Sequence, residues 1–311
     1  MEYMYKVLND QDIPSDAGIA IEYNIPQTSK RVDFLISGYG NKEDANVVLI
    51  ELKQWDELEA IPGRDGLVET YTGNAVRQVV YPSYQAWSYA MLISDYNASV
   101  QEGMVSIFPC AYLHNYRRHD QDPLEAEQYE TYLEDAPAFT RGEVIKLRDF
   151  IKKCIRTGDN KELIYKIDSG RIKPSKSLQD SIAKMLKGNR EFIMLDEQKV
   201  VYEEILNESR QSVQDDKKRV VIVKGGPGTG KSVVAVNLLA ELTKEDQFCQ
   251  YVSKNSAPRN VYRKKLKGSI RKSSVDNMFK GSGIYTETDN NMIDTILVDD
   301  YGIIGLSQKA A

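Results

Sequence analysis

Histidine and cysteine are scarce in this chain of 311 residues, and their scarcity limits the chemistry that it can carry. The two histidines, His114 and His119, are too few for a histidine-rich metal centre. A bound metal would therefore be held by carboxylates and would be a hard cation such as Mg²⁺ or Mn²⁺. The three cysteines, Cys110, Cys154 and Cys249, lie far apart and lack the paired spacing of a zinc site or a disulfide framework. They are expected to be reduced thiols of a cytoplasmic protein.

Long apolar runs and a surplus of positive charge are also missing. No apolar run is long enough to span a bilayer, and residues 1–10 lack the features of a secretory signal, so no membrane association is expected. A net charge of −5 argues against a strongly basic surface but leaves room for a local basic groove that binds nucleic acid. The length and the 41% hydrophobic content allow two domains with cores of ordinary size.

The first part of the chain alternates between strand-like and helical patterns. Alternating and β-branched residues predict strands over residues 19–25, 31–37, 47–53 and 105–113. Apolar residues at helical spacing predict a helix over residues 78–96, and a short helix is expected at residues 4–8. The expected order is thus a helix, three strands, a helix and a strand, which is an α/β arrangement.

The segments that follow are less regular. Residues 120–135 are acidic and polar and are expected to form an exposed loop. A helix is expected over residues 143–155, because Thr140 and Glu143 have the spacing of a capping box. The pair Arg117 and Arg118 fits a contact with a phosphate backbone and a solvated loop equally well.

Two carboxylates and one lysine are expected to meet on neighbouring strands of this first part. Glu51 and Lys53 are two residues apart on a strand, so their side chains point to the same face. If Asp33 faces them from the neighbouring strand, the three groups surround one point. Metal-assisted hydrolysis of a phosphodiester needs such a set, in which the carboxylates hold the metal and the lysine orients the attacking water.

This constellation resembles the PD-(D/E)xK nuclease superfamily of RecB-type, restriction-endonuclease-like domains. Asp33 and Glu51-x-Lys53 match its signature, and the αβββαβ order matches its core. The resemblance implies catalytic roles for Gln85 and Tyr89, which fit a Q-x-x-x-Y motif, and for Glu22 as an accessory acid. The proline that precedes the motif aspartate in the family is absent. Taken singly, the same residues fit a surface ion pair, a turn aspartate and helix packing.

The second part of the chain contains a phosphate-binding motif without a mismatch. Its sequence from residue 225 to 232 fits G-x-x-x-x-G-K-[ST], in which glycines let backbone N–H groups face the phosphates of ATP. An apolar, buried strand over residues 220–223 and a helix over residues 233–242 are expected on either side. The candidate nucleotide-binding residues are Gly225, Gly226, Gly228, Thr229, Gly230, Lys231 and Ser232.

Two further residues extend this nucleotide site. Asp299 ends an apolar strand pattern over residues 294–298, as a Walker B carboxylate does, and would hold Mg²⁺ together with Ser232. Gln198 lies in a Leu-Asp-Glu-Gln motif similar to the adenine-reading glutamine of superfamily-one helicases. An ordinary exposed glutamine near a helix start is the alternative interpretation of Gln198.

These motifs, with Ser175-Lys-Ser-Leu and Tyr251-Val-Ser-Lys-Asn-Ser, resemble the Schlafen-group-three-like DNA/RNA helicase family over residues 171–300. The family usually has glutamate after the Walker B aspartate, where this chain has Asp300, so nucleotide binding is expected and hydrolysis is doubtful. The expected organisation is a nuclease-like domain at 1–157, a helical connector at 158–190, and an incomplete RecA-like P-loop domain at 191–311.

Together these features predict a Mg²⁺- or Mn²⁺-dependent nuclease that acts on DNA, or on RNA, and is regulated by ATP bound at the second domain. A role in defence against foreign DNA or in repair rests on analogy with such fusions. The alternative is a nucleotide-binding switch whose nuclease fold only binds nucleic acid or a protein partner. A third interpretation is a subunit whose ATPase is completed by another copy or by a partner chain.

Overall fold

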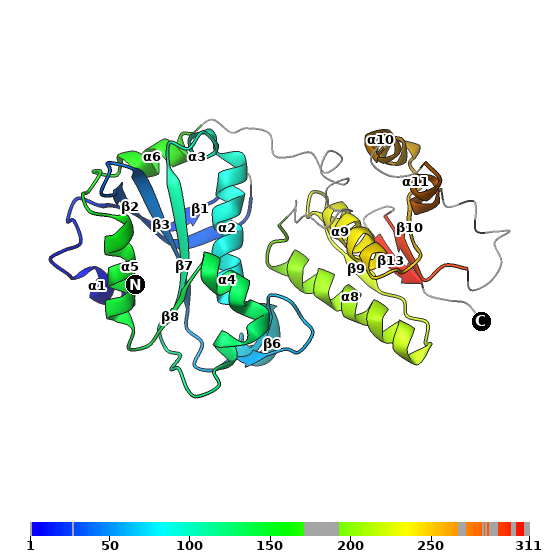
Figure 1. Cartoon of the computed structure of the whole chain (residues 1–311), viewed down its shortest axis with the longest axis horizontal. Coiled ribbons are helices and arrows are strands. Elements are labelled where there is room, and N and C mark those ends of the chain that lie inside the picture. The colour runs from blue at the N-terminus through cyan, green and yellow to red at the C-terminus, as the bar shows by residue number, and fades with distance from the viewer. Residues whose placement is uncertain are drawn as a thin grey trace. The chain divides into compact units, whose positions relative to one another are not determined.

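The computed structural model divides into two compact units, residues 1–175 and 176–311. It describes residues 2–26, 28–170, 193–266, 272–281, 283, 285, 292–299 and 303–307. Both units combine helices with sheets, which confirms the α/β class (Figure 1). None of the helices in these ranges is long and apolar enough to cross a bilayer.

The first unit is built on a five-stranded sheet of mixed orientation. Its spatial order is β1-β2-β3-β7-β8, with antiparallel pairing in β1-β2-β3 and parallel pairing in β3-β7-β8. These strands span Gly18–Asn24, Arg31–Tyr39, Ala45–Lys53, Ser106–Leu113 and Ala138–Thr140. The four strands expected from sequence are therefore present, and β8 is a fifth that the sequence patterns did not predict.

Helices cover both faces of this sheet (Figure 1). Side chains of α1 and α5 share a buried apolar cluster with one face of β2, β3 and β7, whereas α2 packs on β3 and β7 without joining that cluster. The helices of this unit are α1 Glu2–Leu8, α2 Pro82–Tyr96, α3 Ala98–Gln101, α4 Glu130–Asp135, α5 Val144–Cys154 and α6 Glu162–Asp168. Since cluster members such as Ile50 alternate with Glu51 along β3, Glu51 belongs to the α2 face.

A second, three-stranded antiparallel sheet in this unit corrects one expectation. This sheet consists of β4 Glu59–Ala60, β5 Leu67–Thr72 and β6 Ala75–Val80, and β6 replaces the start of the helix that was expected over residues 78–96. The turn between β5 and β6 is made by Gly73 and Asn74, which both have positive φ and favour a tight hairpin. The helix begins only at Pro82, where a missing backbone N–H is tolerated.

One loop expectation also changes, whereas the helix expected over residues 143–155 is confirmed. Residues 120–135 form short helices, η1 Pro123–Glu125, η2 Glu127–Tyr129 and α4, and they bury Leu124, Tyr129 and Tyr132. These buried side chains, which are spaced among exposed acidic ones, fix the stretch to the core. Helix α5 begins at Val144, and the Glu143 carboxylate accepts hydrogen bonds from the backbone and hydroxyl of Thr140, as in half of a capping box.

The expected connector does not begin at residue 158. Asp159 is buried and accepts hydrogen bonds from Gly18 N (2.8 Å), Ser37 Oγ (2.8 Å) and Leu163 N (2.9 Å). These bonds fasten α6 to β1 and β2, so this helix is part of the first unit. The remainder of the expected connector, residues 171–190, lies outside the described residues.

The second unit has its own sheet and its own core. The spatial order is β11-β10-β12-β13-β9, with parallel pairing in β11-β10-β12 and β13 antiparallel to both of its neighbours. The strands span Ile222–Lys224 (β9), Cys249–Val252 (β10), Phe279–Lys280 (β11), Thr295–Val298 (β12) and Ile303–Ser307 (β13). Strand β9 lies at the edge, which is why Val220 and Ile222 are exposed instead of buried as the sequence suggested.

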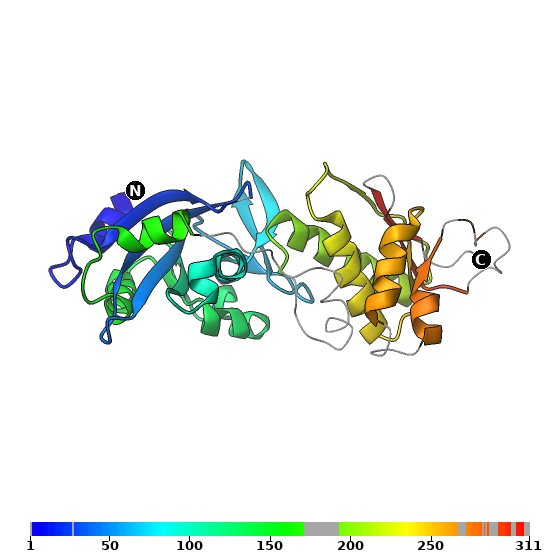
Figure 2. The same ribbon diagram turned by 90° about the horizontal axis from the view of Figure 1, so that it is seen from above.

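In the described part of this unit, four helices accompany the sheet. They are α8 Glu197–Asp215, α9 Lys231–Lys244, α10 Ser256–Leu266 and α11 Lys272–Met278. Helix α8 packs against α9, and α9 packs against β10 (Figure 2). The apolar face of α9 forms the centre of the buried cluster of this unit.

Candidate functional site

Asp33, Glu51 and Lys53 come together at the end of the β2-β3 pair. Phe34 pairs with Ile50, and continuing this antiparallel register by one residue places Asp33 opposite Glu51. The Asp33 carboxylate accepts a hydrogen bond from Leu52 N (2.8 Å), and Glu51 Oε1 accepts one from Asp33 N (3.4 Å). The two carboxylates therefore both turn toward the space between these strands.

Lys53 completes this group from the same strand as Glu51. Its Nζ lies 3.5 Å from Glu51 Oε2, with side-chain exposures of 14% for the lysine and 2% for the glutamate. The ammonium also lies over the ring of Trp55, at 5.7 Å from the ring centroid. A buried carboxylate with an adjacent, partly exposed ammonium combines oxygen ligands for a hard cation with a positive group for developing charge.

Gln85 and Tyr89 lie on helix α2, which covers the face of the sheet that carries Glu51. Gln85 Nε2 donates a hydrogen bond to Tyr89 Oη at 3.1 Å. Helix α2 begins near the carboxyl ends of β3 and β7 and ends near the start of β7. Gln85 is in the first turn of this helix, so it lies at the same end of the sheet as Lys53, the last residue of β3. Tyr89 is buried, and it supports Gln85 from within the helix layer.

Glu22 is placed differently from the other predicted residues. Its neighbours Ile21 and Tyr23 pair with Phe34 and Val32, so Glu22 sits opposite Asp33 in β1. Its backbone has φ of 48°, however, and its carboxylate is bound by Arg31 Nη1 at 3.0 Å on the exposed surface. The structure thus gives Glu22 a partner outside the group formed by Asp33, Glu51 and Lys53. Within the described ranges, no cluster of three or more acidic, histidine or cysteine side chains is arranged to hold a metal.

The phosphate-binding motif forms a loop between β9 and helix α9. Gly228 and Gly230 have φ of 75° and 83°, which residues with a side chain rarely adopt. A side chain at Gly230 would also collide with Gln198 Nε2. Helix α9 begins directly after Gly230, so its positive N-terminal end faces the loop.

Within this loop Lys231 is held by the backbone. Its Nζ donates hydrogen bonds to Gly225 O (2.8 Å) and Gly226 O (2.6 Å) and lies 3.4 Å from Thr229 Oγ1. A bound phosphate would compete for this ammonium with neutral carbonyl groups, and a charged acceptor makes the stronger bond.

Ser232 and Asp299 meet across the sheet. Strands β9 and β12 run in the same direction, because both are antiparallel to β13, so their carboxyl ends lie at one edge. Ser232 Oγ donates to Asp299 Oδ2 at 2.8 Å. The same carboxylate oxygen accepts a hydrogen bond from Tyr251 Oη. Burial is the main cause that raises the pKa of the Tyr251 hydroxyl, and this hydrogen bond raises it further. Tyr251 was not predicted as a site residue, since only the pairing of β10 with β12 brings it to Asp299.

Gln198 connects helix α8 to the phosphate-binding loop. Its Nε2 donates to Thr229 O (3.0 Å), and its Oε1 accepts from Leu195 N (3.1 Å). The side chain is therefore oriented at both ends and lies beside Gly230. Asp300, Tyr301, Gly302 and the segment Ser175–Leu178 lie outside the described residues.

A comparison with known protein families gives a match that lies within the second unit. Residues 218–300 match the family model described as Schlafen group 3, DNA/RNA helicase domain. This match supports a helicase-like segment in the chain, and it contains the phosphate-binding loop and Asp299. Searches of curated proteins and of solved structures gave no significant match.

Proposed function

We propose that the first unit hydrolyses phosphodiester bonds of nucleic acid and that a nucleotide bound by the second unit regulates this reaction. The observation that carries the proposal is the meeting of Asp33, Glu51 and Lys53 at one end of the β2-β3 pair. The helicase-like segment at residues 218–300 adds support, since helicase domains act on DNA or RNA.

The residues of the first unit fit a divalent cation. Asp33 and Glu51 supply carboxylate oxygens, which Mg²⁺ and Mn²⁺ prefer, and they would hold such an ion. When bound, the ion supplies Lewis-acid chemistry and lowers the pKa of its water. Lys53 orients the attacking water and offsets the negative charge that develops on the phosphate. Gln85 would hold the substrate strand from helix α2.

The residues of the second unit fit ATP with Mg²⁺. The loop N–H groups between Gly225 and Gly230, except at Pro227, and the positive end of α9 are suited to bind the phosphates. Lys231 would move from its backbone acceptors to the β- and γ-phosphates, while Ser232 and Asp299 would hold Mg²⁺. Gln198 is placed beside the loop, where it would contact the base.

The test of the nuclease proposal is cleavage of end-labelled DNA and RNA strands by the full chain with Mg²⁺ or Mn²⁺. We expect cleavage by the wild type and a loss of about 100-fold or more with Asp33→Ala, because one of two metal-holding groups is removed. Asp56→Ala is the matched control, since Asp56 is an exposed aspartate of the same unit. Equal cleavage by Asp33→Ala and wild type refutes the proposal, as does the absence of any cleavage.

A further inference from the structure

A cleft rich in arginine lies beyond the carboxyl ends of β7 and β8. It is lined by Arg117, Arg118, Thr140, Arg141, Gly142 and Glu143. Two loops form it, one following β7 and the other following β8, and they are joined where Arg141 N donates to Tyr116 O at 2.8 Å. Three guanidinium groups from segments far apart in the sequence therefore share one hollow.

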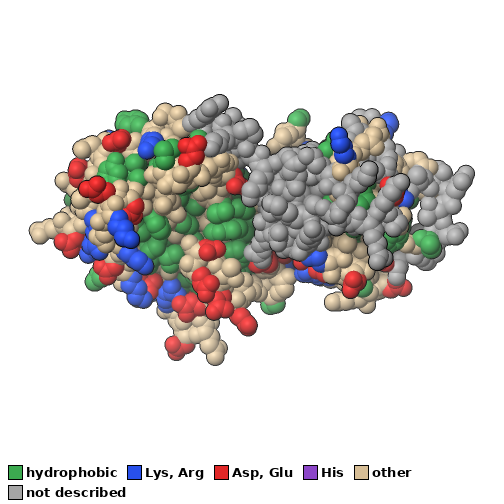
Figure 3. Space-filling model, turned by 45° about the horizontal axis from the view of Figure 1, so that its top comes forward, with side chains coloured by type: hydrophobic (Ala, Val, Ile, Leu, Met, Phe, Trp, Pro, Cys, Tyr) green, Lys and Arg blue, Asp and Glu red, His purple; other side chains and the backbone are tan. Residues whose placement is uncertain are grey.

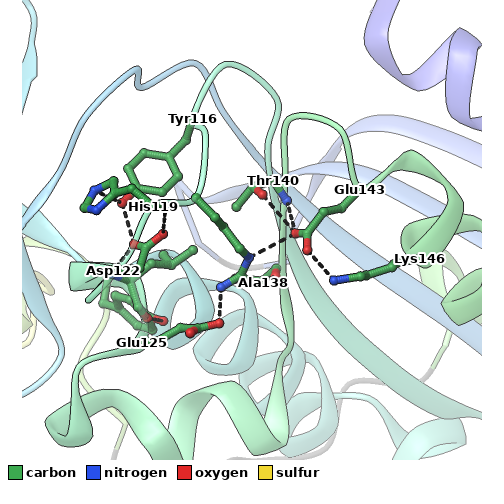
Figure 4. Close-up of polar contacts among 11 residues, drawn as sticks. Tyr116, His119, Asp122, Glu125, Ala138, Thr140, Glu143 and Lys146 are labelled. Carbon is green, nitrogen blue, oxygen red and sulfur yellow. Dashed lines mark hydrogen bonds and ion pairs between the residues drawn. The ribbon is translucent and has the colours of Figure 1, made fainter.

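One of the three arginines is neutralised within the protein. Arg118 Nε donates to Glu143 Oε2 (3.2 Å), its Nη2 donates to Ala138 O (2.9 Å), and its Nη1 contacts Glu125 (Figure 4). Glu143 also accepts from Lys146 Nζ at 2.6 Å. Arg118 thus has a structural role in bridging two loops and is already supplied with acceptors.

Glu143 remains charged in this network at any ordinary pH. Burial raises the pKa of its carboxyl, but hydrogen bonds from Lys146, Thr140 and Arg118 outweigh burial and lower the pKa to about 2. The Glu143 carboxylate is therefore bound by Lys146, Thr140 and Arg118, and it does not neutralise Arg117 or Arg141.

Arg117 and Arg141 are both exposed, and neither side chain has a hydrogen bond or an ion pair within the described part of the chain. A hollow of one sign concentrates the electric field and attracts a ligand of opposite charge. Guanidinium groups bind phosphate oxygens with paired hydrogen bonds.

The acidic side chains nearby confine this positive region to one side. Glu59, Asp120, Asp122 and Glu125 line a neighbouring cleft. On the face of the first unit drawn in Figure 3, a group of basic side chains lies beside a group of acidic ones, and single acidic side chains also lie among the basic group. A polyanion that enters the arginine cleft is thereby steered away from the acidic side.

The arginine cleft and the Asp33–Glu51–Lys53 group share one edge of the sheet. Lys53 pairs with Leu113 of β7, and Leu113 pairs with Thr140 of β8. Lys53 and Thr140 are therefore two strand spacings apart, a distance of ~10 Å. Successive phosphates along one strand of a duplex are about 3.4 Å apart along the axis, so this span covers about three nucleotides.

We propose that Arg117 and Arg141 bind the phosphate backbone of the nucleic-acid strand, a few nucleotides from the bond that is cleaved. The inference rests on the proposed nuclease function for its substrate, and it assigns to that substrate a path along the carboxyl ends of β3, β7 and β8. The contacts are to phosphates, so they position the strand without reading its sequence.

The test is the binding of a fluorescein-labelled single-stranded DNA by the full chain, measured by anisotropy in EDTA over a range of salt concentrations. For Arg117→Ala/Arg141→Ala we expect an affinity about tenfold lower at low salt. The slope of log affinity against log salt should fall in magnitude by about 1.4, because two phosphate contacts are lost. Since EDTA prevents metal-dependent cleavage, this result is independent of whether the protein is a nuclease.

The matched control is Lys42→Ala/Lys153→Ala, which removes the same charge at the opposite end of the sheet. Lys42 lies in the turn that precedes β3, and Lys153 lies at the end of α5; both are exposed. We expect this control to bind as the wild type does. Equal affinity and slope for the arginine variant and wild type overturn the proposal, and so does an equal loss in the control. Loss of binding to polyglutamate with unchanged DNA binding also overturns it, in favour of an acidic protein partner.

Discussion

At the scale of single residues, two ion pairs of the first unit differ in their exposure to solvent. Glu22 and Arg31 are largely exposed, and such pairs contribute little to stability because water screens them. Glu51 and Lys53 are almost enclosed, and enclosing a carboxylate is costly even when it is paired. Enclosure alone does not mark a site, because Lys199 and Glu203 of helix α8 form a pair that is equally enclosed. The position of Asp33 opposite Glu51 is what distinguishes the pair of Glu51 and Lys53.

Glu143 provides a residue-scale prediction about pH. Its pKa in the folded protein is about 2, below the ordinary value of 4.5, so its charge stabilises the folded state above pH 4.5. This stabilisation is lost as pH falls from about 4.5 toward 2. Glu143→Gln should therefore destabilise the first unit by about 1–2 kcal/mol near pH 7 and by much less near pH 2.

The measurement for Glu143 is thermal unfolding followed by tryptophan fluorescence. Both tryptophans, Trp55 and Trp87, lie in the first unit, so the signal reports that unit alone. A difference in Tm between wild type and Glu143→Gln that stays constant from pH 7 to pH 2 contradicts the assignment of a lowered pKa.

At the scale of elements, Asp159 determines how α6 is attached to the sheet. Asp159→Ala would leave Gly18 N and Leu163 N without their acceptor in a buried position, at a cost of about 2–4 kcal/mol. We expect the fluorescence-detected Tm to fall by about 5–10 °C. Asp56→Ala, at an exposed position, should change it by less than about 2 °C. An unchanged Tm in Asp159→Ala would show that α6 does not support the first unit.

Four strands of the first unit, β1, β2, β3 and β7, were predictable because alternation and β-branched residues mark them directly. The hairpin of β5 and β6 was missed, although Gly73 and Asn74 between two runs of valine and threonine are a strong local signal for it. Val79 and Val80 fit a helical pattern equally well, and only pairing with β5 decides between the two. Short apolar runs leave this choice to tertiary contacts.

In the candidate sites, likewise, features set by neighbouring residues in the sequence were predictable, and contacts between distant segments were not. The face shared by Glu51 and Lys53 follows from strand alternation, and the loop from Gly225 to Ser232 follows from its motif. The contact of Tyr251 with Asp299 and the cleft formed by Arg117 and Arg141 depend on which strands become neighbours. Spacing along the sequence carries no information about such neighbours.

At the scale of the whole molecule, the proposed function joins two kinds of phosphate chemistry in one chain. In this proposal the carboxylates and the lysine of the first unit act on a phosphodiester, and the loop and helix N-terminus of the second unit bind a nucleotide. Regulation of one by the other requires that the nucleotide bind more tightly to one state of the protein than to another. ATP should therefore alter cleavage by the wild type and have no effect on Lys231→Ala.

The most direct test of the central claim is the single-turnover rate of cleavage of one labelled DNA strand, with Mg²⁺ or Mn²⁺, by wild type and Lys53→Ala. Lys53→Ala is predicted to lower this rate by about 100-fold or more, because one electrostatic group acting on the transition state is lost. Its DNA affinity in EDTA should remain close to that of the wild type, and Lys42→Ala should cleave normally. Because Lys53→Ala leaves the buried Glu51 carboxylate without this partner and lowers Tm, the rates are compared at a temperature at which both proteins are folded. Cleavage by Lys53→Ala at the wild-type rate would contradict the proposed site.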